Sequence, residues 1–436
     1  MTVTLKKTEL GALPVNWTVY KLEELADKHE NYSFTGGPFG SDLKKSDYTD
    51  EGVRIIQLQN IGEGYFANDY KIYTSEKKAK QLSSCTIYPN DIIIAKMADP
   101  VARACIIPSY ESKYLMASDG IRLVVDKERF DTKFVMYAIN SEYFRRNAEA
   151  QSTGTTRLRI GLSALRALPV AVPSLFEQKK IANILTTIDE QIELTLKFIE
   201  KTKELKRGLE QNLLRKGLGN QNFKESEIGD IPTDWNLVVL ENVLKEKNGY
   251  RRGPFGGALK KEIFVESGYP VYEQQHAIHN GNKEFRYFVT EEKFNEMKNF
   301  AVKDGDFLIS CSGTVGKVIR IDESFPKGII NQALLRLRFN EEILNSDFGL
   351  HLLKSEYMFK QMTGKTHGTT LKNIVGASEF KKIPFALPPI KEQIKIASIL
   401  SSIDEQINIH IESMVNYKNL KKGLMQKLLT GKIRVR

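Results

Sequence analysis

Two stretches of the chain carry apolar residues at alternating spacings of three and four positions. The first contains Ile181, Leu185, Ile188, Ile192, Ile199, Leu205, Leu209 and Leu213. The second contains Ile396, Leu400, Ile403, Ile407, Met414, Tyr417, Leu420, Leu424 and Leu428. Apolar residues at this spacing form a narrow stripe along one side of an α-helix. The pattern predicts two helices, over 176–216 and 391–436, each about 50 Å long.

The two predicted helices are expected to pack against each other. Each begins just after a proline-rich entry, at 169–173 and 384–389. A long, narrow stripe suits a helix partner better than a domain surface, although packing of each helix only on its own domain remains the alternative. The residues predicted to form the helix contact are Ile181, Leu185, Ile188, Ile192, Ile199, Ile396, Leu400, Ile403, Ile407, Leu420 and Leu424. The pattern leaves the relative direction of the helices open.

The rest of the chain has the short alternation of strands and turns. β-Branched and aromatic runs follow turn residues at 53–56, 92–94 and 307–309, and helical stretches come later, at 134–146 and 348–362. This pattern predicts an α+β fold, with one mixed α/β domain at 1–175 and another at 217–390, separated by the two long helices.

The second half of the chain repeats the first. Gly37-Pro38-Phe39-Gly40 returns as Gly253-Pro254-Phe255-Gly256, at an offset of 216 (254 − 38). From Pro169 to Leu214 the offset stays at 215 (384 − 169), whereas before that it drifts. An inserted residue rotates the rest of a helix by about 100° and destroys its apolar stripe, so the ungapped segment is the packed helix.

Composition indicates one class of partner and argues against disulfide-bonded, metal-binding and membrane proteins. The net charge is +10, from 64 Lys plus Arg against 54 Asp plus Glu, which suits DNA but is also common in basic proteins that bind no nucleic acid. The three cysteines form no CxxC pair, so neither a disulfide framework nor a metal site is predicted. The sequence shows no apolar leader and no membrane-length run, so we expect a cytoplasmic protein.

No catalytic motif is found. The only Gly-Lys-Thr, Gly364–Thr366, has Phe359 where a phosphate-binding loop needs its first glycine. There is no Asn-Pro-Pro-aromatic motif of the kind amino-methyltransferases use, no dinucleotide fingerprint and no HExxH. We therefore predict no catalytic residue, no cofactor and no metal.

The tandem arrangement resembles the specificity subunits of type I restriction-modification systems. The resemblance covers essentially the whole chain. It rests on Trp17 and Trp235, the two Gly-Pro-Phe-Gly turns, LISCSGTVGKV at 308–318, Gly-Thr-Thr at 154 and 368, and the repeated helix entry LP...P...EQ..IA.IL..IDEQI. It implies two target-recognition domains held apart by two antiparallel coiled-coil helices. It also implies double-stranded DNA, two methyltransferase subunits and, in the full complex, restriction subunits as partners.

A fixed pair of helices would act as a ruler, so that each domain reads one half of a split, asymmetric DNA site. Candidate base readers are Gln57, Gln59 and Asn60 in the first repeat and Gln274, Gln275 and His276, beside Glu273, in the second. Candidate phosphate contacts are Lys44, Lys45, Arg157, Arg159, Lys260, Lys261, Lys317 and Lys372. The alternatives are ordinary polar residues at strand ends and solvated surface charge.

Two further features have structural and functional interpretations. We predict that the Gly-Pro-Phe-Gly turns are structural, with the phenylalanine tucked inward. The basic helix ends, 203–216 and 418–436, fit either the helix dipole or contact with DNA or an acidic partner. Competing hypotheses for the whole chain are a coiled-coil scaffold that binds only protein and an unrecognised nuclease or methyltransferase.

Overall fold

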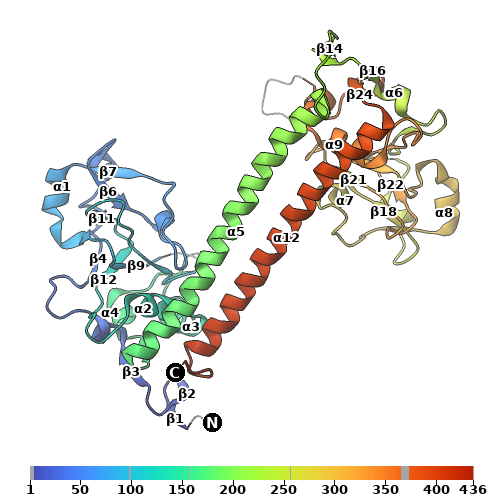
Figure 1. The fold of residues 1–436 in the computed structure, drawn as a ribbon. Helices are drawn as coiled ribbons and strands as arrows, with labels where there is room; N and C mark the ends of the chain where they lie inside the picture. The colour runs from blue at the N-terminus through green and yellow to red at the C-terminus, as the bar shows by residue number, and fades with distance from the viewer. Residues whose placement is uncertain (1–3, 98–99, 156, 256, 365–372, 436) are drawn as a thin grey trace. The chain divides into compact units, whose positions relative to one another are not determined.

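The computed structural model describes residues 4–97, 100–155, 157–255, 257–364 and 373–435 (Figure 1). The chain divides into two compact units, Met1–Leu196 with Glu412–Arg436, and Lys197–Ile411. Each unit holds one mixed α/β domain and a part of both long helices. Lys372 and the second Gly-Thr-Thr lie outside the described residues. None of the helices in the described ranges has an apolar stretch that could cross a membrane.

The domain of the first unit contains two larger sheets. One has the strand order β10-β9-β12-β4 and the other β5-β7-β6-β11-β8, in which β6 and β11 are parallel. Small pairs β1-β2 and β3-β13 accompany them. The strands are β1 (Leu5–Thr8), β2 (Gly11–Pro14), β3 (Thr18–Lys21), β4 (Phe34–Gly36), β5 (Tyr48–Thr49), β6 (Val53–Ile56), β7 (Ile72–Thr74), β8 (Thr86–Ile87), β9 (Ile92–Ala95), β10 (Ala104–Ile106), β11 (Tyr114–Met116), β12 (Gly120–Leu123) and β13 (Pro169–Val172). The α-helices are α1 (Glu76–Gln81), α2 (Thr132–Ile139), α3 (Glu142–Ala150) and α4 (Leu162–Ala167), and the 3-10 helices are η1 (Leu22–Leu25), η2 (Lys45–Asp47), η3 (Leu58–Asn60) and η4 (Ser83–Cys85).

The domain of the second unit repeats this plan. Its larger sheets have the orders β17-β23-β20-β21 and β19-β18-β22, with β18 and β22 parallel, beside the pairs β14-β15 and β16-β24. The strands are β14 (Phe223–Lys224), β15 (Ile231–Pro232), β16 (Asn236–Val239), β17 (Tyr250–Arg252), β18 (Tyr269–Tyr272), β19 (Phe288–Val289), β20 (Phe307–Ser310), β21 (Val318–Arg320), β22 (Ile329–Ile330), β23 (Leu334–Leu337) and β24 (Pro384–Leu387). The helices are α6 (Leu240–Val243), α7 (Gln274–Ile278), α8 (Glu291–Glu296), α9 (Ser346–Lys354), α10 (Glu356–Thr363), α11 (Ala377–Lys381), η5 (Lys261–Ile263) and η6 (Lys298–Phe300).

The buried strands are the apolar runs that the sequence indicated. All four residues of β9 and of β20 are buried, and Trp17 and Trp235 are fully buried in the cores of their domains. The late helical stretches are each split in two. Ser141 and Ser355 interrupt them, because each serine side chain accepts a hydrogen bond from the backbone N–H three residues on and so begins a new helix.

The two long helices are α5 (Leu175–Lys216) and α12 (Ile390–Leu428). The second was predicted to reach residue 436 but ends at Leu428. Gly431 has φ +69°, and a Cβ atom there would lie 2.6 Å from the Pro14 side chain, so the chain turns out of the helix and folds onto the β1-β2 hairpin. Gly217, after α5, has φ +71° and lies just as closely against Trp235, where a Cβ would be 2.8 Å from the ring.

Both units place α5 against α12. In the first unit Lys421 Nζ lies 2.5 Å from Asp189 Oδ1. In the second, Lys206 Nζ lies 2.7 Å from Asp404 Oδ1, and the Leu218 N–H donates to Glu392 Oε1 at 2.9 Å. Between Lys206 and Leu218 the chain runs toward its C-terminus, while the contact on α12 shifts from Asp404 back to Glu392, near the N-terminus of that helix. The two helices run in opposite directions there.

Most positions of the predicted stripe are buried or partly buried, but the prediction is wrong at two of them, Leu205 and Leu420. The buried members are Ile181, Leu185, Ile188, Ile199, Leu213, Ile396, Leu400, Ile403, Ile407 and Leu428, while Ile192, Leu209, Met414, Tyr417 and Leu424 are partly buried. Leu420 is 50% exposed, and Leu205 is 57% exposed. The next residue in each case, Lys421 or Lys206, occupies the stripe, since a lysine stem can lie along an apolar surface while its ammonium pairs with an aspartate.

The first turns of each helix also belong to the core of a domain. Ile181 and Leu185 lie in the apolar cluster around Trp17, and Ile396 and Leu400 lie in the cluster around Trp235. Leu424 of α12 packs on the first cluster, and Leu213 of α5 belongs to the second. The two packing alternatives are therefore combined, because each cluster contains residues of its domain, of α5 and of α12.

Candidate nucleic-acid interface

In each domain, two parallel strands end side by side. Ile56 of β6 is paired with Met116 of β11, and the N–H of the next residue, Ala117, donates to Ile56 O at 2.9 Å. In the second domain, Tyr272 is paired with Ile330, and the Asn331 N–H donates to Tyr272 O at 2.9 Å. Residues that follow parallel strands collect at the carboxyl edge of the sheet, where ligands of such sheets commonly bind.

The Gly-Pro-Phe-Gly loop lies against the same edge. A Cβ atom on Gly37 would be 1.9 Å from Ala117 O, and one on Gly253 would be 1.8 Å from Asn331 O. Only glycine allows this approach. The loop is held there by hydrogen bonds from the Gly37 N–H to Gly120 O at 2.7 Å and from the Gly253 N–H to Leu334 O at 2.9 Å.

The prediction that the phenylalanine of this loop is tucked inward is wrong. Phe39 is 83% exposed and Phe255 is 94% exposed. The proline before each of them is the buried residue instead. Because the glycine is pressed against the neighbouring turn, the loop turns the proline toward the protein and the phenylalanine toward solvent.

A basic loop joins this edge in the first domain. Arg159 Nη2 lies 2.7 Å from Asp119 Oδ1, and the backbone of Ile160 donates to Lys96 O at 3.0 Å. We use the name strand-end face for the loops 36–40, 57–60, 117–119, 153–155 and 157–159 in the first domain, and 252–255, 273–276 and 331–333 in the second. Each strand-end face combines polar turns, a tight glycine and an exposed phenylalanine.

Two candidate base readers are buried and serve the fold instead. Asn60 is fully buried, accepts from the Gln57 N–H at 3.0 Å and donates to the carbonyls of Ala67 and Tyr70. At the equivalent position His276, 1% exposed, accepts from the Glu273 N–H through Nδ1 at 2.9 Å. Burial lowers the pKa of His276. Both side chains cap the turn that follows a strand, so their prediction as base readers is wrong.

The other candidates lie on or beside the strand-end face. Gln59 is exposed, Gln57 donates to Tyr48 Oη at 3.2 Å, and Gln275 donates to Glu273 Oε2 at 3.1 Å. Gln274 has a buried Oε1 that finds no hydrogen-bond partner among the described residues. These four glutamines stay candidate base readers.

The predicted phosphate contacts are mainly on the surface. Lys44, Lys45, Arg157, Lys260, Lys261 and Lys317 are exposed. Arg159 is exposed too, but it is paired with Asp119. Lys372 lies outside the described residues. The exposed cations stay candidate phosphate contacts, because a duplex could reach them without a change in the fold.

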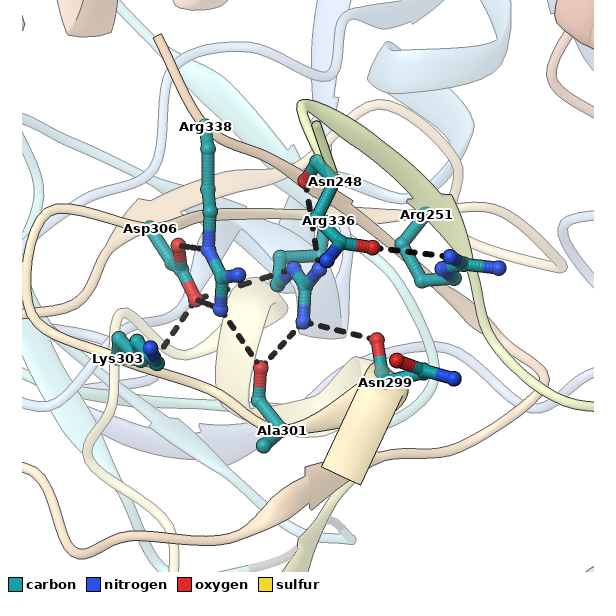
Figure 2. Close-up of polar contacts among 8 residues, drawn as sticks. All are labelled: Asn248, Arg251, Asn299, Ala301, Lys303, Asp306, Arg336 and Arg338. Carbon is teal, nitrogen blue, oxygen red and sulfur yellow. Dashed lines mark hydrogen bonds and ion pairs between the residues drawn. The ribbon is translucent and has the colours of Figure 1, made fainter. Parts of the chain in front are cut away.

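Other arginines are buried and structural. Arg338 pairs with Asp306 through Nε at 2.5 Å and Nη2 at 3.0 Å, as Figure 2 shows. Arg336, fully buried beside it, donates to the carbonyls of Asn299, Ala301 and Asn248. Burial lowers the pKa of Arg336 to about 10, so it is still charged at neutral pH. This cluster ties β20 and β23 to the neighbouring loops and is not available to DNA.

The repeated Glu-Gln of the helix entry fastens the helices. Gln178 accepts from the Asp131 N–H at 2.8 Å and donates to Pro173 O at 2.9 Å. Glu177 accepts from Arg434 through both oxygens, at 2.6 and 2.7 Å. In the second unit, Gln393 and Glu392 hold the corresponding segments, and Glu392 also accepts from Trp235 Nε1 at 2.9 Å. The motif that marks the repeat most clearly is therefore structural.

The basic end of α12 lines a cavity of about 810 Å³ in the first unit. Lys418, Lys421 and Lys422 line it together with residues of α3, and carboxylates lie among the cations. Arg145 Nη1, for example, lies 2.8 Å from Glu63 Oε2. The mixed lining leaves both interpretations of the basic helix end open.

One grouping has the residue types of a hydrolase triad but not its geometry. His351 Nε2 lies 2.9 Å from Ser401 Oγ, whereas Nδ1 lies 3.9 Å from Asp404 Oδ2, and Asp404 pairs more closely with Lys206. Burial lowers the pKa of His351 to about 4. A base with so low a pKa, 3% exposed, is poorly suited to activate a serine. Among the described residues there is also no cluster of three or more metal-binding side chains.

Comparison with known proteins decides the family. A family model described as "Type I restriction modification DNA specificity domain" matches residues 14–204 and, again, 232–415. The chain belongs to this specificity family. A putative type I restriction enzyme specificity subunit, MjaX, of Methanocaldococcus jannaschii is 27% identical over 99% of the chain and 97% of its own length. The MjaVIII specificity subunit of the same organism is 29% identical over 74% and 75%.

Solved structures show the specificity-family fold. A chain from a type I restriction-modification assembly matches with a TM-score of 0.60 at 16% identity, covering 97% of this chain and 99% of that one. The S subunit from M. genitalium matches with a TM-score of 0.54 at 18% identity, covering 98% and 99%. The resemblance inferred from the sequence is confirmed. The chain is a type I specificity subunit with two specificity domains, and its family places it outside the catalytic subunits.

Proposed function

We propose that this specificity subunit binds a split, asymmetric DNA site, with one half for each domain. The observation that carries the proposal is the strand-end face, which occurs once in each domain with different polar residues. Gln57 in the first corresponds to Glu273 in the second, and Asp119 corresponds to Ala333. Because amide, carboxylate and apolar groups match different base edges, the two halves of the site should differ.

The long helices are the proposed spacer. We take 176–216 and the helical part of 391–436 as an antiparallel coiled coil that fixes the distance between the recognition domains, 1–175 and 217–390. The burial of Ile188, Ile199, Ile403 and Ile407 supports this assignment, as do the two Lys–Asp pairs on the stripe. A stiff spacer of constant length would leave the DNA between the half-sites unread.

Two methyltransferase subunits and, in the full complex, restriction subunits are the proposed protein partners. The two units repeat the same fold and the same glutamine attachment of the helix, which supports one copy of a partner for each unit. Non-catalytic binding of double-stranded DNA then supplies the sequence choice, and the partners supply the chemistry. The competing function is a scaffold that binds only protein.

The test is to express the chain together with its methyltransferase subunit and to map methylated adenines across a genome. We expect a split motif with two unlike halves and a fixed spacer. Gln59→Ala should relax the first half only, because loss of one bidentate base contact costs about 1–3 kcal/mol of discrimination. Tyr110→Ala is the control, since Tyr110 is exposed in the same domain and precedes the amino end of β11, so its replacement should leave the motif unchanged. A stable complex without sequence-dependent methylation would support the scaffold instead.

A further inference from the structure

Phe39 and Phe255 are the two most exposed large apolar side chains among the described residues, at 83% and 94%. They occupy the same position in the two repeats, at an offset of 216 (255 − 39). Large apolar side chains are normally buried, and isolated exposed ones are common enough to need no explanation. The same extreme exposure at one position in both repeats is different, because it means that the shared loop presents an aromatic ring to solvent in each domain.

The ring is held on a built support and not on a loose loop. The proline before it is buried, and the glycine before that is pressed against the neighbouring turn. The carbonyl of the phenylalanine accepts a hydrogen bond from the N–H three residues later, Asp42 in one repeat and Ala258 in the other, each at 2.9 Å. Both sides of the phenylalanine are therefore fixed, and its outward direction is set by the backbone.

The surroundings of the ring suit DNA. Two exposed lysines follow it within six residues in each repeat, Lys44 and Lys45 or Lys260 and Lys261. The glutamines of the strand-end face lie on the adjoining turns. Lysines attract phosphates without regard to sequence, and the faces of stacked bases are the large apolar surface that DNA offers to an aromatic ring.

We infer that Phe39 and Phe255 are DNA wedges, each of which enters the base stack at one half-site. Proteins that deform DNA insert apolar side chains between base steps in this way. The inference rests on the proposed function, because it assumes that the strand-end face meets DNA. It adds a positioning element that opens one base step in each half-site while the polar side chains read base edges.

The experiment uses the full chain in complex with its methyltransferase subunits and duplexes that carry 2-aminopurine at successive steps of each half-site. With the unmodified chain, fluorescence should rise at one step in each half, because unstacking relieves quenching of the base. Phe39→Ala should abolish the rise in the first half only and lower affinity on the order of tenfold, while Phe39→Trp should keep the rise. Phe255→Ala should do the same in the second half.

Tyr110→Ala is the matched control. Tyr110 is 63% exposed in the same domain, but it precedes the amino end of β11, away from the strand-end face. Its replacement should change neither fluorescence nor affinity. Thermal unfolding of every variant checks that the fold is kept.

Each contrary result has a separate meaning. If the unmodified complex binds no DNA in a sequence-dependent way, the proposed function fails. If it binds, and Phe39→Ala and Phe255→Ala match it in both affinity and fluorescence, the wedge is overturned and the proposed function stands. If the alanine variants assemble less completely with the methyltransferase subunit, while the complexes that do form bind DNA normally, the rings contact protein. The wedge is then again overturned.

Discussion

Gln178 and Gln393 make the same set of hydrogen bonds in their two domains, whereas the turns after the parallel strands are capped by different residues. Each glutamine accepts from one backbone N–H and donates to two backbone carbonyls. Asn60 and His276, by contrast, cap equivalent turns with different side chains. Contacts made to the backbone do not depend on which side chains the domain carries. The helix attachment can therefore stay constant while the strand-end face changes.

The two repeats also differ in how they neutralise a buried aspartate. Arg122 Nε lies 2.7 Å from Asp91 Oδ2, with side chains 5% and 9% exposed. Asp306, at the equivalent place, is held mainly by Arg338, with Arg336 Nε 3.9 Å away. Burial raises the pKa of Asp91 because it disfavours the charged carboxylate. The charged form therefore depends on the partner that stabilises it.

The largest expected effect follows from this difference. Arg122→Met should lower the free energy of unfolding of the first domain by about 3–5 kcal/mol, because it leaves the buried Asp91 carboxylate without the arginine that pairs with it. Arg336→Met should cost the second domain less, about 1–3 kcal/mol, since Asp306 keeps Arg338 and only carbonyls lose a donor. Urea unfolding with hydrogen exchange resolved by domain measures both. Equal losses would mean that the two arginines are equivalent after all.

A loss of stability at low pH that depends on a buried histidine should appear in the second unit. His351 occupies the place of Tyr137, whose hydroxyl donates to Asp189 at 2.7 Å. Since the pKa of His351 falls from 6.5 to about 4 on folding, the unfolded chain binds the proton more readily between these values. Stability from this group is complete above about pH 6.5 and is lost as the pH falls toward 4, by up to about 3 kcal/mol.

Denaturant unfolding at a series of pH values tests this expectation. In the second unit, stability should decline between pH 6.5 and 4, and His351→Gln should reduce that decline, leaving the part due to His276, whose pKa is also lowered by burial. The first unit serves as the internal control, because it has Tyr137 in the equivalent place. A decline that the substitution leaves unchanged would assign the pH dependence to another group.

The shared helix attachment should respond equally in both units. Gln178→Ala and Gln393→Ala each remove hydrogen bonds to buried backbone groups, and each should cost about 1–3 kcal/mol. Lys179→Ala is a suitable control for the first, since Lys179 is exposed on the next helical position. Differential scanning calorimetry with hydrogen exchange gives the comparison. Unequal losses of stability would show that the same hydrogen bonds contribute differently in the two units.

The smallest effect is expected on the helix stripe. Lys206 and Lys421 are 19% and 18% exposed, and their aspartates are 40% and 31% exposed. Partly solvated ion pairs of this kind contribute about 0.2–1 kcal/mol. Lys206→Met and Lys421→Met should therefore change thermal stability little, and similarly in the two units. A loss of several kilocalories in one of them would reveal an asymmetry that the distances do not.

The sequence predicted the long helices because their period is a property of the whole segment, which single residues rarely disturb. It misplaced Leu420 because apolarity alone assigns a leucine to the stripe, whereas the constant alternation of three and four positions leads to Lys421. It misplaced Phe39 for a related reason. A phenylalanine is expected inside, and only the contact between Gly37 and Ala117, distant in sequence, turns the ring outward.

The candidate site was predicted in part. The polar turns at 57–60 and 273–276 were located correctly as strand ends, since an apolar run followed by polar residues marks such a place. Asn60 and His276 looked like readers because their capping bonds depend on backbone conformation. The available signal was their position in the turn that follows a strand, because a side chain there can accept a hydrogen bond from the backbone N–H three residues before it. The pairing of Asp119 with Arg159 joins loops far apart in the chain and had no local signal.

The glutamine attachment has a consequence for how such proteins diversify. Because Gln178 and Gln393 bond only to peptide groups, this part of the attachment would survive replacement of one domain by recombination, whereas a new domain would still have to fit core residues of the helix such as Ile181 or Ile396. The boundary of an exchange would fall most safely in the proline-rich entries, just before these glutamines. If the proposed function holds, new combinations of half-sites could then arise in a single genetic event, while the proposed spacer helices are inherited unchanged.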